Sequence, residues 1–203
     1  MPALTPRSAT KWVTDPAVNA LSRLGVTPNM LTLAGFGGNV GAAVLAADGR
    51  FLAAGIVMLA FSALDFLDGS LARATGRATP FGSVFDATMD RLSEAAVLFG
   101  LLWFFSDRGA REEELLIFAA VVASIMVSYL RARAEVIGLK LRDGLFTRTE
   151  RVLLLGGGLI LQDVIDENVL TPVLWALALI AGFTALQRLA MVWLRTRNMS
   201  DST

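Results

Sequence analysis

Two pairs of aspartates stand in apolar segments of this sequence, at spacings that place each pair on one face of a helix. Asp65 and Asp68 end the uncharged run 51–64, and Asp86 and Asp90 lie in the next apolar segment. Residues three or four apart are neighbours on a helix surface. The connection between the two segments is short, so we expect their helices to be antiparallel neighbours. Four carboxylates close together in a medium of low dielectric repel one another unless cations compensate their charge. Divalent cations with oxygen ligands would provide that compensation, and two such ions can support a displacement at phosphorus.

An ordinary explanation exists for any single aspartate. Each could lie at a solvated helix end or form an ion pair with Arg73, Arg77 or Arg91. For all four at this spacing inside apolar helices a functional site is favoured, because acidic side chains within membrane segments are costly and usually functional.

The composition narrows the chemistry further. The chain has no Cys and no His, which excludes disulfides, a thiolate zinc site, an imidazole base and a Ser-His triad. Oxygen ligands favour Mg²⁺, Mn²⁺ or Ca²⁺, and proton transfer is left to a carboxylate, Lys or Tyr. Lys plus Arg and Asp plus Glu are balanced at 18 each, so no nucleic-acid partner is expected.

The elements that position the aspartates are predicted to be membrane helices. Hydrophobic residues make up 55% of the 203 residues, and uncharged runs recur along the chain. A spanning helix needs roughly 20 mostly apolar residues. We therefore predict an all-α integral membrane protein, one domain over residues 1–203, with six transmembrane helices at 28–48, 51–74, 81–106, 112–137, 148–165 and 169–195. A soluble all-helical core is the alternative.

The basic residues support the number six. Of the 18 Lys and Arg residues, only Arg50, Arg108 and Arg111 fall on one side of this arrangement. The positive-inside rule then predicts a multi-pass protein of the cell membrane, with both termini and the aspartates at the cytoplasmic side.

Local signals predict where helices begin. Thr27-Pro28 and Thr79-Pro80 read as an N-cap followed by proline at the first helical position, and Thr147 with Glu150 has the spacing of a capping box. Thr14-Asp15-Pro16 predicts a short amphipathic helix to about Leu24. It would lie in the membrane interface, within a cytoplasmic N-terminal segment 1–26.

The aspartates belong to a longer pattern that resembles a known family. Asp65-x2-Asp68-Gly69-x2-Ala72-Arg73-x8-Gly82-x3-Asp86-x3-Asp90 matches the signature of the CDP-alcohol phosphatidyltransferases at all eight positions. The resemblance implies a six-helix membrane enzyme, usually a homodimer, that transfers a phosphatidyl group from CDP-diacylglycerol to an alcohol. It also implies two metal ions, Mg²⁺ with Mn²⁺ possible, one held by Asp65, Asp68 and Asp86 and the other by Asp65, Asp86 and Asp90.

The resemblance also assigns roles around the metals. Asp90 would be the base that deprotonates the acceptor hydroxyl. Residues in three short stretches would line the CDP-lipid site: Pro28, Asn29, Met30 and Leu31; Gly69 and Arg73; Thr79 and Gly82.

The acceptor alcohol is expected to be an inositol phosphate. The stretch Ser128-Tyr129-x-Arg131-Ala132-Arg133-Ala134-Glu135, with Glu150-Arg151 and Gln187-Arg188-Leu189, resembles the bacterial phosphatidylinositol-phosphate synthases within the family. That likeness implies that Arg131, Arg151 and Arg188 bind the acceptor's phosphate, although Lys is common at the first position. A phosphatidylglycerol-phosphate synthase using glycerol phosphate is the nearest alternative, and a non-enzymatic transporter coupling ions to its aspartates is one of a different class.

Overall fold

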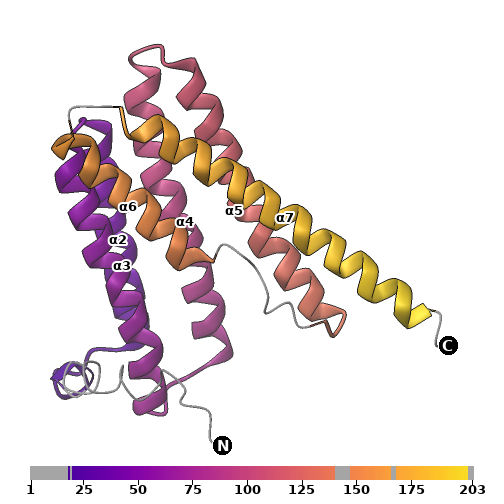
Figure 1. The fold of residues 1–203 in the computed structure, drawn as a ribbon. Helices are drawn as coiled ribbons and strands as arrows, with labels where there is room; N and C mark the ends of the chain where they lie inside the picture. Colours follow the sequence, from indigo (N-terminus) through magenta and orange to yellow (C-terminus); the bar gives the residue numbers. More distant parts are fainter. Residues whose placement is uncertain (1–17, 19, 140–146, 166–167, 201–203) are drawn as a thin grey trace, which may run out of the picture.

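The structure is a computed structural model that describes residues 18, 20–139, 147–165 and 168–200. Over these residues the chain is helical, and no strand is found among them. Figure 1 shows the six long helices: α2 (Pro28–Ala47), α3 (Phe51–Ala74), α4 (Pro80–Ser106), α5 (Arg111–Val136), α6 (Arg148–Val164) and α7 (Leu170–Ser200). The predicted all-helical class is confirmed, and five of the predicted ranges agree closely, while α7 continues beyond its predicted end.

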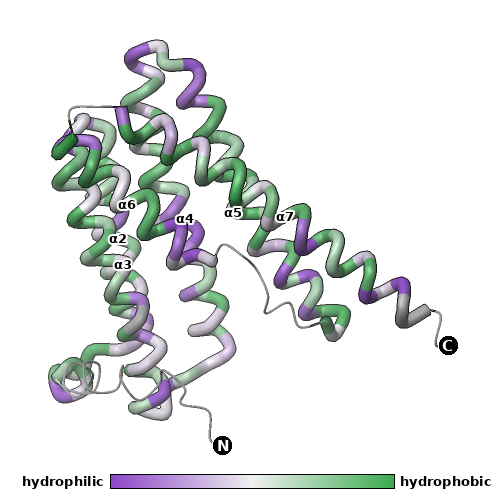
Figure 2. The backbone as a smooth tube through the Cα atoms, viewed as in Figure 1, coloured by the Kyte–Doolittle hydropathy of each residue, from purple (hydrophilic) through white to green (hydrophobic). Residues whose placement is uncertain are grey.

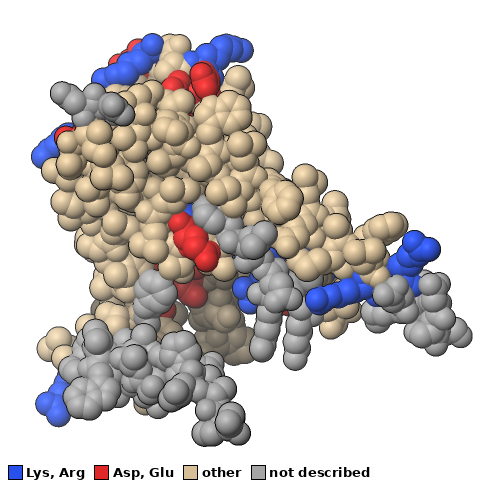
Figure 3. All heavy atoms as spheres, viewed as in Figure 1, with Lys and Arg blue, Asp and Glu red and all other residues tan. Residues whose placement is uncertain are grey.

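Four helices, α2, α3, α5 and α7, are long and apolar enough to cross a membrane. Of the remaining two, α4 carries four charged residues, Asp86, Asp90, Arg91 and Glu94, and α6 has only 17 residues. Hydrophobic residues run along all six helices in Figure 2. In Figure 3 charged groups lie at the upper end of the molecule and again lower down. A broad surface without Lys, Arg, Asp or Glu separates the two sets.

The predicted capping signals form as local contacts. Thr27 Oγ1 accepts a hydrogen bond from the Met30 backbone N–H at 3.3 Å, and Thr79 Oγ1 accepts one from Gly82 at 2.9 Å. The Glu150 carboxylate accepts a hydrogen bond from the Thr147 backbone N–H, as the capping box requires. These caps fix where α2, α4 and α6 begin, and the site lies at these ends.

The helices form a closed ring of neighbours. Each packs mainly on two others, in the spatial order α2, α3, α6, α7, α5, α4 and back to α2. Small residues permit close approach, as expected for helices packed in a membrane. A Cβ at Gly100 of α4 would collide with the backbone of Ala43 in α2, and a Cβ at Gly55 of α3 would lie 2.7 Å from the Gly156 carbonyl oxygen in α6.

One expected neighbour relation is wrong. Because a short connection joins α3 to α4, the sequence predicts that these helices pack against each other, but α2 lies between them and makes the main contacts with both. A Cβ at Gly38 of α2 would collide with the Phe61 ring of α3, so α2 reaches α3 as closely as it reaches α4. The two aspartate pairs therefore face each other across space bordered by α2.

The predicted N-terminal amphipathic helix falls mostly outside the described residues. Residues 18 and 20–23 are helical, and Val18 is buried against Leu31 and Leu71. This contact ties the described end of the N-terminal segment to α2 and α3.

Candidate active site

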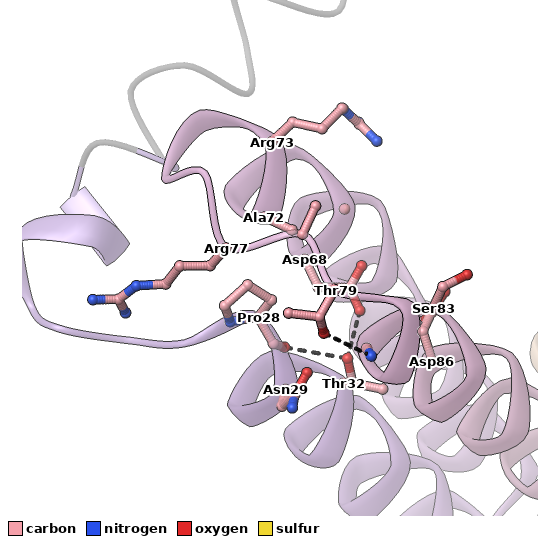
Figure 4. A pocket seen from close by; sticks show the side chains of 13 residues that line it. Pro28, Asn29, Thr32, Asp68, Ala72, Arg73, Arg77, Thr79, Ser83 and Asp86 are labelled. Atoms are coloured by element: carbon pink, nitrogen blue, oxygen red, sulfur yellow. Dashed lines mark hydrogen bonds between the residues drawn. The ribbon is translucent and has the colours of Figure 1, made fainter.

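A pocket of about 240 Å³ lies where α2 and α4 begin and α3 ends. Its lining comes from all three helices and from the connection between α3 and α4: Pro28, Asn29, Thr32, Asp68, Gly69, Ala72, Arg73, Arg77, Ala78, Thr79, Gly82, Ser83 and Asp86. Figure 4 shows Asp68, Asp86, Thr32 and Thr79 around the pocket, with Arg73 and Arg77 extending away from it on different sides. Six of the eight signature positions thus line one cavity.

Asp68 is held in place by a neighbouring helix. It is buried, with 5% of its surface exposed, and Thr32 of α2 donates a hydrogen bond to its Oδ2 at 2.7 Å. The Thr32 hydroxyl also lies 3.2 Å from the carbonyl oxygen of Pro28. Thr32 therefore orients an acidic side chain at the pocket, a role that the sequence pattern alone does not indicate.

Arg148, at the start of α6, joins the two remaining aspartates. Its Nη2 lies 2.6 Å from Asp65 Oδ2, and its Nη1 lies 3.0 Å from Asp90 Oδ1. All three side chains are largely shielded, with relative exposures of 26%, 10% and 18% for Arg148, Asp65 and Asp90. The backbone of α2 also comes close, because a Cβ at Gly35 would lie 2.7 Å from Asp65 Oδ1.

The four aspartates are electrostatic neighbours. Asp65 and Asp68 lie close enough to Asp86 to repel its negative charge. Asp65 and Asp86 lie close enough to Asp90 to do the same. Within the described residues, no three acidic side chains converge as a ready metal cluster. A cationic group nevertheless lies between Asp65 and Asp90, and all donors are carboxylate oxygens, which are the ligands that hard divalent cations prefer. The donor set therefore fits a divalent cation.

Most residues expected to bind the CDP-lipid line the pocket. Pro28, Asn29, Gly69, Arg73, Thr79 and Gly82 do so. A Cβ at Gly82 would lie 3.0 Å from Thr79 Oγ1 and 3.5 Å from Asn29 Oδ1, so glycine keeps space between two polar groups. Arg73 lies at the rim, where its Nη2 donates to Ser70 Oγ at 3.2 Å.

Two expected members of this set lie outside the lining. Leu31 is buried against Val18 and Leu71, and Met30 is 56% exposed. Their positions on α2 turn them away from the pocket, whereas Thr32, Arg77, Ala78 and Ser83 line it without having been expected.

The three arginines expected to bind the acceptor come from three helices. Arg151 (α6) and Arg188 (α7) are buried, with 4% and 6% exposure, and Arg131 (α5) is exposed. The charges of Arg131 and Arg151 both act on the Arg188 guanidinium, so Arg188 lies within electrostatic range of each of the other two. We call these three residues the basic cluster.

Each member of the basic cluster has a partner within the protein. Arg131 pairs with Glu135 at 3.1 Å, and Arg188 Nη1 donates to the Val127 carbonyl at 2.7 Å. Arg151 donates two hydrogen bonds to Glu94 of α4, from Nε at 2.7 Å and from Nη2 at 2.9 Å. The buried Nε of Arg188 has no hydrogen-bond partner among the described residues.

Two residues of the site could have been found only from the structure. Arg148 appears in the sequence as one of six basic residues near α5 and α6, and nothing in its spacing points to Asp65 and Asp90. Glu94 follows Asp90 by one helical turn, and an acid inside a membrane segment is a functional signal, but nothing in its spacing points to Arg151 as its partner.

Comparison with known proteins identifies the relatives of this chain. Residues 25–187 match the model of the CDP-alcohol phosphatidyltransferase family. The phosphatidylinositol phosphate synthase of Mycobacterium tuberculosis is 37% identical over 193 residues, which is 92% of this chain and 88% of that protein.

Two crystal structures of a phosphatidylinositol phosphate synthase from Mycobacterium tuberculosis are also similar, each 36% identical and each covering 89% of this chain. One has CDP-DAG bound, with a TM-score of 0.81 and 94% of its own chain covered. The other is a complex with manganese and citrate, with a TM-score of 0.80 and 88% of its chain covered.

Proposed function

The chain belongs to the CDP-alcohol phosphatidyltransferase family, and from this premise we propose that it transfers a phosphatidyl group from CDP-diacylglycerol to an inositol phosphate. The products are a phosphatidylinositol phosphate and CMP. A single observation carries the proposal: six signature residues line one pocket, and the other two, Asp65 and Asp90, are bridged by Arg148.

The reaction is a substitution at the phosphorus that carries the diacylglycerol. The acceptor hydroxyl oxygen forms a bond to this phosphorus, the bond to the bridging oxygen breaks, and CMP leaves with the bonding electrons. The hydroxyl proton is assigned to Asp90 because the family resemblance gives this residue the role of base, and the chain has no histidine that could take it instead.

The pocket at α2, α3 and α4 binds the CDP part of the donor in this proposal. Thr79 and Asn29 present polar groups on either side of Gly82, which leaves room for the cytosine. Gly69 lets the donor approach the backbone of α3, and Arg73 at the rim supplies a planar cation suited to two phosphate oxygens. Leu31 contributes by packing the start of α2 against Val18 and Leu71 rather than by contact with the donor, and Met30 lies exposed beside it.

The carboxylates are proposed to hold two divalent cations, Mg²⁺ or alternatively Mn²⁺. Asp65, Asp68 and Asp86 would hold one, and Asp65, Asp86 and Asp90 the other. When bound, such ions neutralise negative charge on the phosphate oxygens. The support is the all-oxygen donor set, the guanidinium already accommodated between two of its members, and the manganese in a similar structure.

The basic cluster is proposed to bind the phosphate of the acceptor. Arg131 and Arg151 each lie within electrostatic range of Arg188, and Arg151 is one helical turn from Arg148, which contacts Asp65 and Asp90. Guanidinium groups pair with phosphate through two parallel hydrogen bonds, which sets orientation as well as affinity. A glycerol phosphate acceptor would use the same charges, so the acceptor has to be decided by assay.

The membrane arrangement is proposed from the apolar segments and the distribution of the basic residues. We propose that all six helices cross the membrane as one domain over residues 1–203, with both termini and the site at the cytoplasmic side and residues 1–26 at the interface. Only three of the 18 basic residues, Arg50, Arg108 and Arg111, would then lie on the opposite side of the membrane, which supports this orientation. Surrounding lipid is one partner, and a homodimer is the expected assembly.

The decisive experiment measures CMP release by the purified protein with CDP-diacylglycerol, Mg²⁺ and one acceptor at a time. We expect release with inositol phosphate, and a lipid product whose mass equals phosphatidylinositol phosphate. Release only with glycerol 3-phosphate would assign the alternative synthase. No release with any acceptor, combined with ion-dependent transport in vesicles, would favour a transporter.

A further inference from the structure

A buried carboxylate connects three helices next to the basic cluster. Glu94 of α4 is 8% exposed and receives two hydrogen bonds from Arg151 of α6. Ser124 of α5, 7% exposed, donates a third at 2.7 Å to Glu94 Oε1. Oε1 therefore serves two donors, and both carboxylate oxygens are engaged.

The geometry of this pair fixes a direction as well as a distance. Nε and Nη2 form one edge of the Arg151 guanidinium, and Glu94 takes both of them. A planar guanidinium held along one edge cannot rotate without losing a hydrogen bond. The opposite edge, with Nη1, keeps its donors for another acceptor.

Stability alone does not account for the pair. Transferring two charges from water into the protein interior costs about as much as their attraction returns, so a buried pair is weak evidence for a role in stability. The nearby Arg91 and Arg148 have Asp90 beside them, but Arg188 of α7 does not. Arg188 is buried within electrostatic range of Arg151, and its Nε has no hydrogen-bond partner among the described residues. Two buried guanidiniums with unused donors therefore point to a further anion as their ligand.

We propose that Glu94 is a positioning residue for the acceptor, holding Arg151 so that its Nη1 edge meets the acceptor's phosphate, with Ser124 fixing Glu94 in turn. This inference rests on the proposed function and deepens it, because it explains how one buried arginine is directed at the acceptor. The source of the phosphate is the soluble inositol phosphate.

The sign of the effect separates positioning from simple charge balance. If Glu94 only offset positive charge, its neutralisation would strengthen the attraction for phosphate and lower the acceptor KM. If Glu94 positions Arg151, the same change frees the guanidinium to turn, and the acceptor KM rises. Glu94→Asp also distinguishes positioning from charge balance, because it keeps the negative charge but is one methylene too short to make the same two hydrogen bonds. Only positioning predicts a higher acceptor KM for this variant.

The test titrates inositol phosphate at saturating CDP-diacylglycerol for the wild type, Glu94→Gln, Glu94→Asp and Ser124→Ala. We expect the acceptor KM to rise about tenfold or more in both Glu94 variants and about two- to tenfold in Ser124→Ala. The KM for CDP-diacylglycerol should change by less than about twofold. In an Arg151→Lys background, Glu94→Gln should raise the acceptor KM little further, because the lysine has already lost the paired hydrogen bonds to Glu94.

Controls keep the outcome interpretable. Glu113 also links two helices, accepting a hydrogen bond from Thr171 at 2.6 Å, and Glu113→Gln should leave the acceptor KM unchanged. If Glu94→Gln does not fold in detergent, Ser124→Ala still tests the inference. An acceptor KM that stays level or falls in the folded variants would overturn the role of Glu94 while leaving the proposed function intact. A wild type that does not use inositol phosphate would overturn both.

Discussion

Arg148 is expected to compete with divalent cations, and its removal is the most informative single change at the site. Its guanidinium contacts Asp65 and Asp90 at 2.6 and 3.0 Å, two carboxylates that are proposed metal ligands. A cation that binds both acids has to displace these contacts. In Arg148→Gln nothing has to be displaced, so metal should bind more tightly while the metal-free protein becomes less stable.

The size of the effect follows from the two contacts. A hydrogen bond to a charged group contributes about 1.5–3 kcal/mol. Both contacts are charge-assisted, but the side chains keep some access to solvent, so we count the equivalent of one full bond rather than two. That free energy corresponds to a cation affinity roughly 10- to 150-fold higher in the variant.

Binding of Mn²⁺ to the purified protein, followed by electron paramagnetic resonance with Mg²⁺ as competitor, measures this directly. Thermal unfolding in EDTA should give a lower Tm for Arg148→Gln than for the wild type. Added metal should raise the Tm of the variant by more than that of the wild type. Arg133→Gln, at an exposed position in the last turn of α5, is the matched control and should change neither quantity. Equal or weaker Mn²⁺ binding by Arg148→Gln would refute the competition and make Arg148 part of the metal-bound site.

Further predictions concern the acids, the basic cluster and the helix contacts. EDTA should abolish transfer, and Asp65→Asn should lose most of it; full activity in either case would reject the metal site. Asp90→Asn should still bind CDP-diacylglycerol but transfer at least about 100-fold more slowly, and near-normal turnover would assign the base elsewhere. Neutralising Arg131, Arg151 or Arg188 should raise the acceptor KM roughly 10- to 150-fold, with Arg133→Gln unaffected. Gly100→Ala should lower the Tm through its collision with Ala43, whereas Gly157→Ala, with open space around it, should not; equal effects would show that this contact is not tight.

The sequence predicted what depends on local chemistry. Thr27-Pro28 and Thr79-Pro80 act within one helical turn, so the starts of α2 and α4 could be predicted to within a residue. The signature likewise identified six residues of one pocket, because its members are close in sequence and lie on helix faces set by the 3.6-residue period.

Features that depend on helix packing could not be predicted in this way. Whether α3 touches α4 or α2 depends on which helix presents small residues: Gly35 and Gly38 of α2 lie against α3, and Gly100 of α4 lies against α2. Arg148 reaches Asp65 from 83 residues away, and Arg151 reaches Glu94 from 57 residues away. Helix periodicity relates only residues a few positions apart, so it cannot predict contacts between residues this far apart in sequence. They depend on the packing of α6 between α3 and α7.

The order of the helices along the chain fixes the order in which the site can assemble during synthesis. Every residue that lines the pocket lies between Pro28 and Asp86, so a nascent chain that has inserted α2, α3 and α4 already contains them all. Arg148 and Arg151 arrive only with α6, and until then Asp65, Asp90 and Glu94 lack their arginine partners. Insertion of α6 therefore supplies the missing counter-charges, and α7, which lies between α6 and α5, then closes the ring, so the first half of the protein depends on completion of the second.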